Sequence, residues 1–308
     1  MNKKIAVIGA GNVGASVAQY AAETNLAEVV MIDIIEGFPQ GKALDLTQAA
    51  PVRGYNGMVT GSNDYKDIKG ADIVIMTAGL ARKPGMSRED LLNMNAKIVG
   101  DAGKNIKKYA PQSYVIVVSN PLDIMTYHMW KSTGFPQNRV CGQAGVLDST
   151  RFRAFIAMEL GVAYTDVQAM VLGGHGDTMV PLPRYTTVAG IPIKELIDAK
   201  RIKEISERTR FGGGEIVKLL KTGSAYYAPA AASVQMARSI LCDEKRLLPC
   251  SCYLNGQYGI KNIYIGVPAV LGANGVEKVI ELTLTKGEMK DLQTSAEKYG
   301  GVLKEIGY

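Results

Sequence analysis

The residues best suited to chemistry in this chain lie in the pentapeptide GGHGD at positions 173–177. His175 is one of only 2 histidines among 308 residues, and a glycine stands on each side of it. Glycine adds no side-chain bulk, so a small molecule can approach the imidazole closely. Imidazole titrates near neutral pH and can therefore give or take a proton under physiological conditions. A loop histidine that only satisfies backbone groups fits this pentapeptide equally well, so other segments must decide.

A second segment, LDSTR at residues 147–151, pairs an acid with a base at the expected start of a helix. Asp148 and Arg151 are three positions apart and therefore lie on neighbouring faces of that helix. Taken alone, such a pair is most often an aspartate that caps the helix and an arginine at the surface.

Two further segments follow expected strands. Residues 79–88, GLARKPGMSR, combine three cations with two glycines and a proline. At the carboxyl edge of a parallel sheet such a loop faces the ligand crevice, although alone it resembles a solvated basic loop. Residues 118–121, VSNP, end another strand, where Asn120 can hydrogen-bond a cofactor amide.

A glycine-rich motif, GAGNVG at residues 9–14, directly follows an expected strand over residues 4–8 and opens a helix. In that context the first glycine permits a tight turn and the second lets the backbone approach a pyrophosphate. The third lets helix and strand pack closely, with the phosphates at the helix N-terminus. We therefore expect a dinucleotide to bind at Gly9, Gly11, Asn12, Val13 and Gly14.

The acidic residue Asp33 indicates which dinucleotide is bound. It ends the second expected strand, about 20 residues beyond the motif, where a carboxylate can bind the adenosine ribose hydroxyls. The same carboxylate would repel a 2′-phosphate, and no arginine follows in residues 34–36. The sequence therefore favours NAD over NADP.

The elements that position these residues alternate in the first half of the chain. Apolar, β-branched runs predict strands over residues 4–8, 28–33, 72–77, 114–119 and 139–142, with helices between them, for example over residues 13–24 and 88–108. Runs such as IVIM suit strands that are buried on both faces of a parallel sheet. The pattern predicts a Rossmann-type, doubly wound α/β domain over residues 1–143.

After residue 143 the pattern changes, so we expect an α+β substrate domain over residues 144–308. Helices are expected over residues 149–160, 200–220, 227–242 and 286–301, and hairpin-like strands between residues 250 and 285. His128 lies in an apolar helical stretch, residues 122–130, and is interpreted as a packed or surface histidine.

Composition restricts the function classes. Hydrophobic residues at 47% and charged residues at 21% are typical of a soluble globular protein. The net charge of +6 is spread along the chain without a nucleic-acid-binding motif, so we expect no nucleic-acid partner. The sequence shows neither a signal peptide nor a membrane span, which favours a cytoplasmic protein. The 4 cysteines lack metal-site spacing and are expected to be reduced, and no metal is expected.

Together these motifs resemble the lactate/malate dehydrogenase superfamily, and within it the malate dehydrogenases of the lactate-dehydrogenase-like kind. The similarity runs essentially end to end through GAGNVG, GLARKPGMSR, VVSNPLD, GVLDSTRFR, GGHGD and GSAYYAPA. It implies an NAD-dependent enzyme that oxidises (S)-malate to oxaloacetate and assembles as a homodimer or homotetramer. Residues 20–29 and 225–232 are the expected contact regions.

The resemblance also implies a role for each site residue. His175 would be the acid/base, oriented by Asp148 rather than by the nearby Asp177. Arg151 would clamp the substrate carboxylate through paired hydrogen bonds, and Arg88 would polarise the reacting carbonyl. The remaining contacts with substrate or cofactor would come from Val118, Asn120 and Asn95.

Arg82 decides the substrate in this interpretation. The corresponding position is typically arginine in malate dehydrogenases and glutamine in lactate dehydrogenases. The distal carboxylate of oxaloacetate can neutralise Arg82 in a closed site, whereas the methyl group of pyruvate would leave it unpaired. That difference should be worth about a thousandfold in specificity.

Three alternatives stay open. A lactate dehydrogenase is opposed by Arg82. An NAD-dependent glycosidase would need a divalent metal, held for instance by Cys141 and His175. A non-catalytic NAD-binding sensor would not need the acid/base and carboxylate-binding residues.

Overall fold

The computed structural model describes residues 3–80 and the chain from Arg88 to Tyr308. The N-terminal half forms strands β1 (Lys4–Ile8), β2 (Glu28–Ile32), β3 (Val59–Ser62), β4 (Ile73–Met76), β5 (Tyr114–Val117) and β6 (Val140–Gly142). Its helices are α1 (Asn12–Glu23), α2 (Phe38–Arg53), α3 (Arg88–Tyr109) and α4 (Leu122–Thr133). The elements alternate, and β1, β2, β4, β5 and β6 coincide with the predicted apolar runs, whereas β3 and α2 were not predicted.

The C-terminal half begins with α5 (Ala144–Leu160). Short strands follow: β7 (Val167–Gln168), β8 (Val171–Leu172), β9 (Val180–Pro181), β10 (Thr187–Val188) and β11 (Ile191–Pro192). The remaining elements are α6 (Ala199–Leu220), α7 (Tyr227–Leu241), β12 (Arg246–Asn255), β13 (Lys261–Gly272), β14 (Gly275–Val279) and α8 (Lys286–Glu305).

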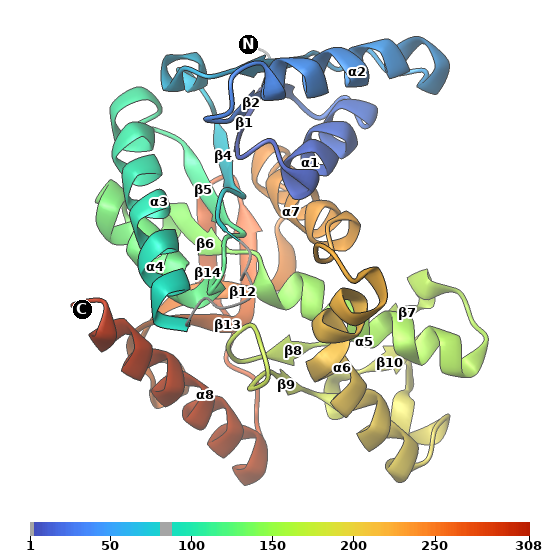
Figure 1. The fold of residues 1–308 in the computed structure, drawn as a ribbon. Coiled ribbons are helices and arrows are strands. Elements are labelled where there is room, and N and C mark those ends of the chain that lie inside the picture. Colours follow the sequence, from blue (N-terminus) through green and yellow to red (C-terminus); the bar gives the residue numbers. More distant parts are fainter. Residues whose placement is uncertain (1–2, 81–87) are drawn as a thin grey trace.

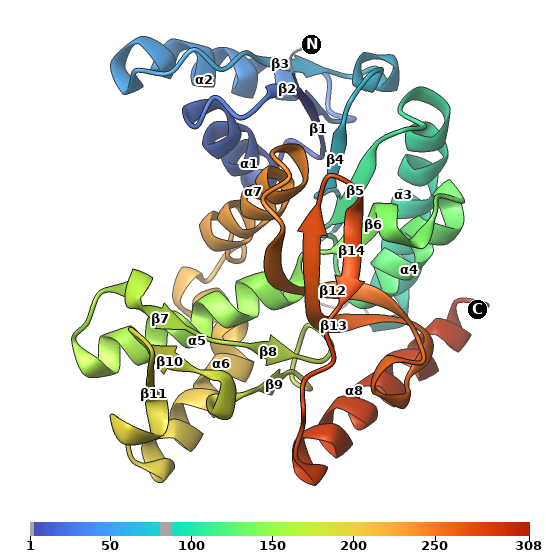
Figure 2. The same ribbon diagram turned by 180° about the vertical axis from the view of Figure 1, so that it is seen from behind.

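One nine-stranded sheet runs through the part of the chain that the structure describes, in the order β14-β13-β12-β6-β5-β4-β1-β2-β3. The strands β1 to β6 pair in parallel, with registers such as Ile5↔Ile73 and Ile73↔Tyr114. Helices α3 and α4 lie on one side of the sheet and α1 and α7 on the other (Figures 1 and 2). This is the doubly wound, Rossmann-type arrangement that the sequence predicts.

The strands of the parallel part are apolar on both faces because helices cover both. All residues of β4 and most of β1, β2 and β5 are buried. The carboxyl ends of these strands therefore form a rigid edge, from which the loops after β1, β2, β4 and β5 project.

The C-terminal hairpin β12–β13 extends the same sheet instead of forming a separate one. Strand β12 pairs antiparallel with β6 at Ser251↔Gly142, and β13 and β14 continue outward. The close approach of these strands depends on Gly142, since a Cβ there would lie 2.8 Å from the Cβ of Ser251. These strands were expected from the sequence, but their attachment to the N-terminal sheet was not.

The start of α5 differs from the expectation. The expected helix started near residues 147–149, with Asp148 as its cap, but α5 begins at Ala144 and Asp148 is buried within it. The first turn of α5 packs closely against β12, because a Cβ on Gly145 would lie 2.9 Å from Pro249. Asp148 is therefore a buried acid and not a surface cap.

Candidate active site

The glycine motif after β1 forms a tight turn into α1. Gly9 has a φ of +99°, and a Cβ there would lie 2.7 Å from the backbone nitrogen of Ala78. A Cβ on Gly14 would lie 1.9 Å from the carbonyl oxygen of Gly9. No other residue type fits either position, so the turn brings the start of α1 close to the carboxyl edge of the sheet.

The middle of the same motif is open. A Cβ on Gly11 would meet nothing within 4 Å, and Asn12 beside it is exposed. Gly11 caps α1 without a side-chain hydrogen bond, and the first turn carries no acidic residue. Val13 is half-buried behind this opening. Free backbone N–H groups at a helix N-terminus bind phosphate, so the motif fits the pyrophosphate of NAD.

Asp33 lies directly after β2 and is fixed beside the glycine motif. Its Oδ2 accepts a hydrogen bond from the Ala10 backbone nitrogen (2.8 Å), and its Oδ1 accepts one from the nitrogen of Ile35 (3.1 Å). Thr77, which the sequence analysis did not single out, donates through Oγ1 to the carbonyls of Ile8 (3.0 Å) and Gly9 (2.9 Å). Asp33 is thus placed where a ribose hydroxyl would follow a bound pyrophosphate.

The structure brings His175, Asp148 and Arg151 together. The imidazole Nδ1 of His175 lies 2.9 Å from Oδ2 of Asp148, and Nη1 of Arg151 donates to Oδ1 of the same carboxylate at 3.2 Å. The side chains of His175, Arg151 and Asp148 are 15%, 12% and 2% exposed. One buried carboxylate therefore orients a base and a cation, and His175 keeps Nε2 for proton exchange.

These contacts have simple structural origins. The three-residue spacing of Asp148 and Arg151 puts them on one face of α5. The histidine loop follows β8, which is tied to α5 because the hydroxyl of Ser149 accepts a hydrogen bond from the Val171 nitrogen at 3.0 Å. The loop is also tied to β13, because the Gly173 nitrogen donates to the Gly266 carbonyl at 2.9 Å.

The electrostatics of the cluster suit acid/base chemistry. Burial lowers the pKa of His175, but the charge and hydrogen bond of Asp148 outweigh burial, so the pKa lies above its ordinary value of 6.5. Burial lowers the pKa of Arg151 below its ordinary value, and the charge of Asp148 counteracts this. The buried Nε of Arg151 has no hydrogen-bond acceptor among the described residues. The guanidinium therefore has donor capacity left for an anionic ligand.

Val118 and Asn120 directly follow β5, and Asn95 on α3 contacts the ends of the loops that follow β4 and β5. The amide of Asn95 is 1% exposed, and its Oδ1 accepts from the Leu80 nitrogen at 2.8 Å. Its Nδ2 donates to the carbonyls of Leu80 (3.2 Å) and Asn120 (2.8 Å). The structure thus makes Asn95 a brace between two loops at this edge, with Val118 buried and Asn120 exposed.

The backbone of the histidine loop is held by residues that the sequence analysis did not identify. Asp123 on α4 accepts from the His175 nitrogen (2.8 Å), and Ser295 on α8 accepts from the Gly174 nitrogen (2.9 Å). The hydroxyl of Tyr299, also on α8, donates to the His175 carbonyl (2.9 Å). Asp123 follows Asn120 within the motif VVSNPLD, which was its only signal in the sequence.

Two of the expected residues cannot be placed. Arg82 and the side chain of Arg88 lie outside the described residues. The other acid near the histidine, Asp177, accepts a hydrogen bond from Lys298 at 2.6 Å, so the ring contact belongs to Asp148.

The second histidine and the cysteines lie elsewhere. His128 is half-buried on α4, where its Nδ1 lies 2.6 Å from the hydroxyl of Tyr308. Cys250 and Cys252 are free, buried and on one face of β12. Among the described residues no cluster of histidine, cysteine or acidic side chains could hold a metal ion.

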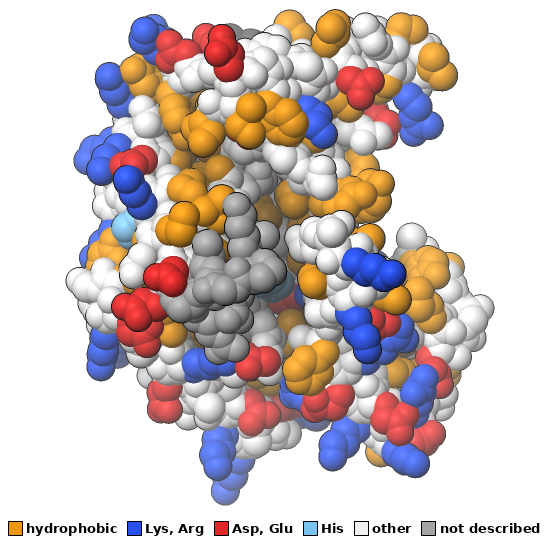
Figure 3. Space-filling model, viewed as in Figure 1, with side chains coloured by type: hydrophobic (Ala, Val, Ile, Leu, Met, Phe, Trp, Pro, Cys, Tyr) orange, Lys and Arg blue, Asp and Glu red, His pale blue; other side chains and the backbone are white. Residues whose placement is uncertain are grey.

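The face that contains the carboxyl edge is hollowed between the part with α1 and α7 and the part with α5 and α6 (Figure 3). Basic and acidic side chains are interspersed on this face.

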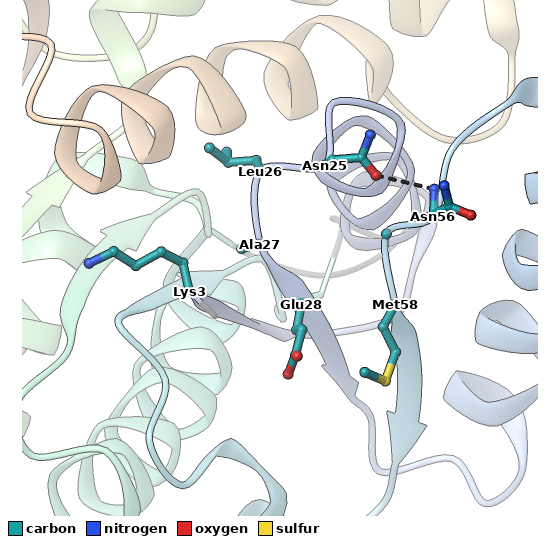
Figure 4. A pocket seen from close by; sticks show the side chains of 8 residues that line it. Lys3, Asn25, Leu26, Ala27, Glu28, Asn56 and Met58 are labelled. Carbon is teal, nitrogen blue, oxygen red and sulfur yellow. Dashed lines mark hydrogen bonds between the residues drawn. The ribbon is translucent and has the colours of Figure 1, made fainter. Parts of the chain in front are cut away.

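A separate small pocket lies at the amino ends of β1, β2 and β3, where Asn25 accepts a hydrogen bond from the Asn56 nitrogen at 3.1 Å (Figure 4). None of the helices in residues 3–80 and 88–308 combines the length and apolar character that crossing a bilayer requires.

Comparison with known proteins gives the same picture. A family model described as the lactate/malate dehydrogenase NAD binding domain matches residues 3–142, and one described as the alpha/beta C-terminal domain of the same family matches residues 145–306. Malate dehydrogenase of Roseiflexus sp. (strain RS-1) is 58% identical over 297 residues, 96% of each chain.

Solved structures agree with this match. Cryptosporidium parvum malate dehydrogenase superposes with a TM-score of 0.97 at 47% identity and covers 99% of both chains. C. parvum lactate dehydrogenase, solved with lactic acid and nicotinamide adenine dinucleotide, gives 0.96 at 46% identity and covers 100% of this chain and 99% of that chain. The chain therefore belongs to the lactate/malate dehydrogenase family, in its lactate-dehydrogenase-like malate dehydrogenase group, and is an NAD-dependent oxidoreductase.

Proposed function

We propose that the protein interconverts (S)-malate and oxaloacetate, with His175, Asp148 and Arg151 as the centre of the site. The observation that carries this proposal is the buried triad, in which Asp148 contacts both the imidazole at 2.9 Å and the guanidinium at 3.2 Å. An acid/base beside a cation with unused donor capacity suits a 2-hydroxy acid, whose hydroxyl and carboxylate are on neighbouring carbons. NAD, when bound, accepts the hydride from C2 of malate.

The residues of this chain have distinct roles in the proposed reaction. Nε2 of His175 takes the hydroxyl proton as malate is oxidised and returns it when oxaloacetate is reduced. Asp148 fixes the ring and stabilises the imidazolium that forms. Arg151 binds the C1 carboxylate, and its planar fork allows two parallel hydrogen bonds that lysine does not offer. Arg88 polarises the carbonyl oxygen, where negative charge develops.

The cofactor roles are proposed on the same basis. The glycine motif receives the pyrophosphate at the start of α1, and Asp33 binds the adenosine ribose hydroxyls. Val118 and Asn120, which directly follow β5, contact the nicotinamide of the bound cofactor, and Asn120 also contacts the substrate. Asn95 holds their loop in place, since it binds the Asn120 carbonyl at 2.8 Å. The motif residues in this set are Gly9, Gly11, Asn12, Val13 and Gly14.

Lactate is the competing substrate, because solved lactate dehydrogenases are as similar in fold as malate dehydrogenases. Arg82 favours malate, since an arginine in a closed site needs the counter-charge of a second carboxylate. The described part of the site binds either substrate, because His175 and Arg151 contact only the atoms that malate and lactate share. Arg82 is therefore the residue on which the substrate proposal depends.

The test is steady-state oxidation of NADH with oxaloacetate and with pyruvate, on the wild type and on Arg82→Gln. We expect the wild type to favour oxaloacetate by at least about a hundredfold in kcat/KM, and the variant to lose most of that preference. Lys83→Gln, which removes a neighbouring positive charge from the same loop, is the matched control and should retain the preference. A wild type that prefers pyruvate would contradict the malate assignment but not the family.

We further propose two functional regions, a dinucleotide-binding region over residues 1–143 and a substrate region over residues 144–308. The first is supported by the glycine motif and Asp33, and the second by Asp148, Arg151 and His175. As in the family resemblance, we propose a homodimer or homotetramer, which light scattering coupled to size-exclusion chromatography will distinguish from a monomer.

A further inference from the structure

A second buried carboxylate lies beside the histidine loop and has no role in the reaction described above. Asp123 is in the first turn of α4, and its side chain is almost fully buried, with 1% of the residue exposed. Its Oδ2 accepts the backbone N–H of His175 at 2.8 Å, and its Oδ1 accepts the hydroxyl of Ser251 at 2.7 Å. Each carboxylate oxygen thus has a donor, which is the arrangement that an ionised acid requires in a dry site.

The position of Asp123 links three elements at the reaction centre. Asp123 lies three residues after Asn120, in the first turn of α4. Its partner Ser251 lies on β12, at the residue where β12 pairs with β6, and its partner His175 lies in the loop after β8. Movement of α4 relative to the histidine loop would break the 2.8 Å hydrogen bond. The loop end that carries Asn120 and the loop that carries His175 are therefore held in fixed relation.

The charged and titratable groups around His175 come from three helices. Asp148 and Arg151 face it from α5 and Asp123 from α4, while the hydroxyl of Tyr299 on α8 donates to its carbonyl. Asp123 in turn faces Ser251, His175, Asp148 and Tyr299. Arg151 shares its contact with Asp148, so two carboxylates and one guanidinium surround a single imidazole.

We propose that Asp123 is a positioning residue for His175, holding the histidine loop through its backbone and supplying a second negative charge that stabilises the imidazolium. This inference rests on the proposed acid/base role of His175. A single carboxylate that is shared with Arg151 leaves the positive charge of a protonated His175 only partly balanced. The charge on Asp123 restores the balance without a direct bond to the ring.

The ionisation of the two groups is consistent with this role. Burial raises the pKa of Asp123 to about 6, although Ser251 and His175 counteract the increase. Asp123 is therefore ionised at neutral pH and becomes neutral in mildly acidic solution. The pKa of His175 is raised by Asp148 and also by Asp123. Loss of the Asp123 charge should lower the pKa of His175.

The decisive experiment measures the ionisation of His175 directly by NMR of protein labelled in the histidine rings. The chain has only 2 histidines, so His128 gives an internal reference signal. Its ring contacts the hydroxyl of Tyr308 and no described residue of the proposed site. In Asp123→Asn the amide can still accept from His175 and donate to Ser251, so shape is kept and charge is lost. We expect the pKa of His175 to fall by at least about half a unit, with that of His128 unchanged.

Tyr299→Phe is the matched control, because it removes another hydrogen bond to the same loop without changing its charge. It should leave the pKa of His175 in place. An unchanged pKa in Asp123→Asn, or an equal fall in both variants, would overturn the proposal. If Asp123→Asn does not fold, Ser251→Ala decides, because it removes the hydrogen bond that lowers the pKa of Asp123 and so favours the neutral acid. The pKa of His175 should then fall, and an unchanged pKa of His175 in Ser251→Ala would overturn the proposal.

Kinetics give a second readout. Reduction of oxaloacetate needs protonated His175, so kcat/KM at saturating NADH falls as the pH rises through its pKa. In Asp123→Asn this limb should move to lower pH by the same amount as the NMR pKa. A protein with the NMR shift but no turnover of oxaloacetate would contradict the proposed function and leave the Asp123–His175 coupling intact.

Discussion

At the scale of single residues, the site depends on one carboxylate with two partners. Asp148 binds His175 and Arg151 at once, so Asp148→Asn should disturb both the proton transfer and the carboxylate clamp. We expect kcat/KM for oxaloacetate to fall by at least about a hundredfold, because an amide neither stabilises the imidazolium nor fixes its tautomer. The pH at which reduction is lost should also move down, since Asp148 raises the pKa of His175.

Asp177→Asn provides the control for this prediction. Asp177 is an acid in the same loop, but its side chain is 62% exposed and paired with Lys298. Loss of the Asp177 charge should change kcat/KM for oxaloacetate by less than about threefold, as expected for an exposed ion pair. Equal effects of the two substitutions would contradict the assignment of Asp148 as the partner of the imidazole.

The sequence predicts the reactive residues better than the residues that hold the histidine loop in place. His175, Asp148 and Arg151 stand in short motifs that indicate acid/base chemistry and carboxylate binding, and the structure brings them together. Asp123 and Tyr299 are common residue types in ordinary helical stretches. Their contacts with the histidine loop join segments 52 and 124 positions apart, and no local pattern encodes such a separation.

At the scale of elements, the run of three glycines in α6 is unexpected for a helix interior. Glycine costs a helix about 1 kcal/mol relative to alanine at each position. A Cβ on Gly213 would lie 3.3 Å from Nη2 of Arg151, whereas a Cβ on Gly214 would meet nothing within 4 Å. A Cβ on Gly212 would likewise lie 3.3 Å from Cδ of Arg151. Gly212 and Gly213 therefore leave space for the Arg151 side chain, with Gly213 beside the guanidinium, and Gly214 has no such contact.

The pair Gly213→Ala and Gly214→Ala tests this explanation within one helix. Both should strengthen α6 by up to about 1 kcal/mol through helix propensity. Only Gly213→Ala should displace Arg151, and we expect it to raise KM for oxaloacetate by about five- to tenfold. Steady-state kinetics and thermal unfolding of both variants check the prediction. Equal KM values for the two would show that the glycine is not needed for the clamp.

Element boundaries show where local pattern fails. The strands β4 and β5 are short apolar runs and were predicted to within two residues. Helix α2 was not predicted, since it buries only Pro39 and Ala43 and so lacks an apolar stripe. The start of α5 was placed too late because the residues before Asp148 are apolar on every side, as suits a helix that is buried between β12 and α6.

At the scale of the whole molecule, the two proposed functional regions share one sheet and one aromatic cluster. Trp130 on α4 packs against Tyr253 of β12 with ring centroids 4.9 Å apart, and against Tyr264 of β13 at 6.1 Å. The pairing of β6 with β12 crosses the same junction. A functional division at residue 143 therefore need not be a division in folding, because the core is continuous across it.

This continuity predicts one cooperative unfolding transition. Trp130 is the only tryptophan of the chain, so its fluorescence reports the contact between the two regions, whereas far-UV circular dichroism reports all helices and strands. We expect the midpoints of the two signals in a urea titration to coincide. NAD binds mainly through the first region, yet at about 100 times its dissociation constant it should stabilise the whole chain by about 2.7 kcal/mol and shift both midpoints together. A fluorescence change at lower urea, with only the later transition shifted by NAD, would contradict this prediction. The regions would then be independent folding units, and the shared sheet would contribute little to their coupling.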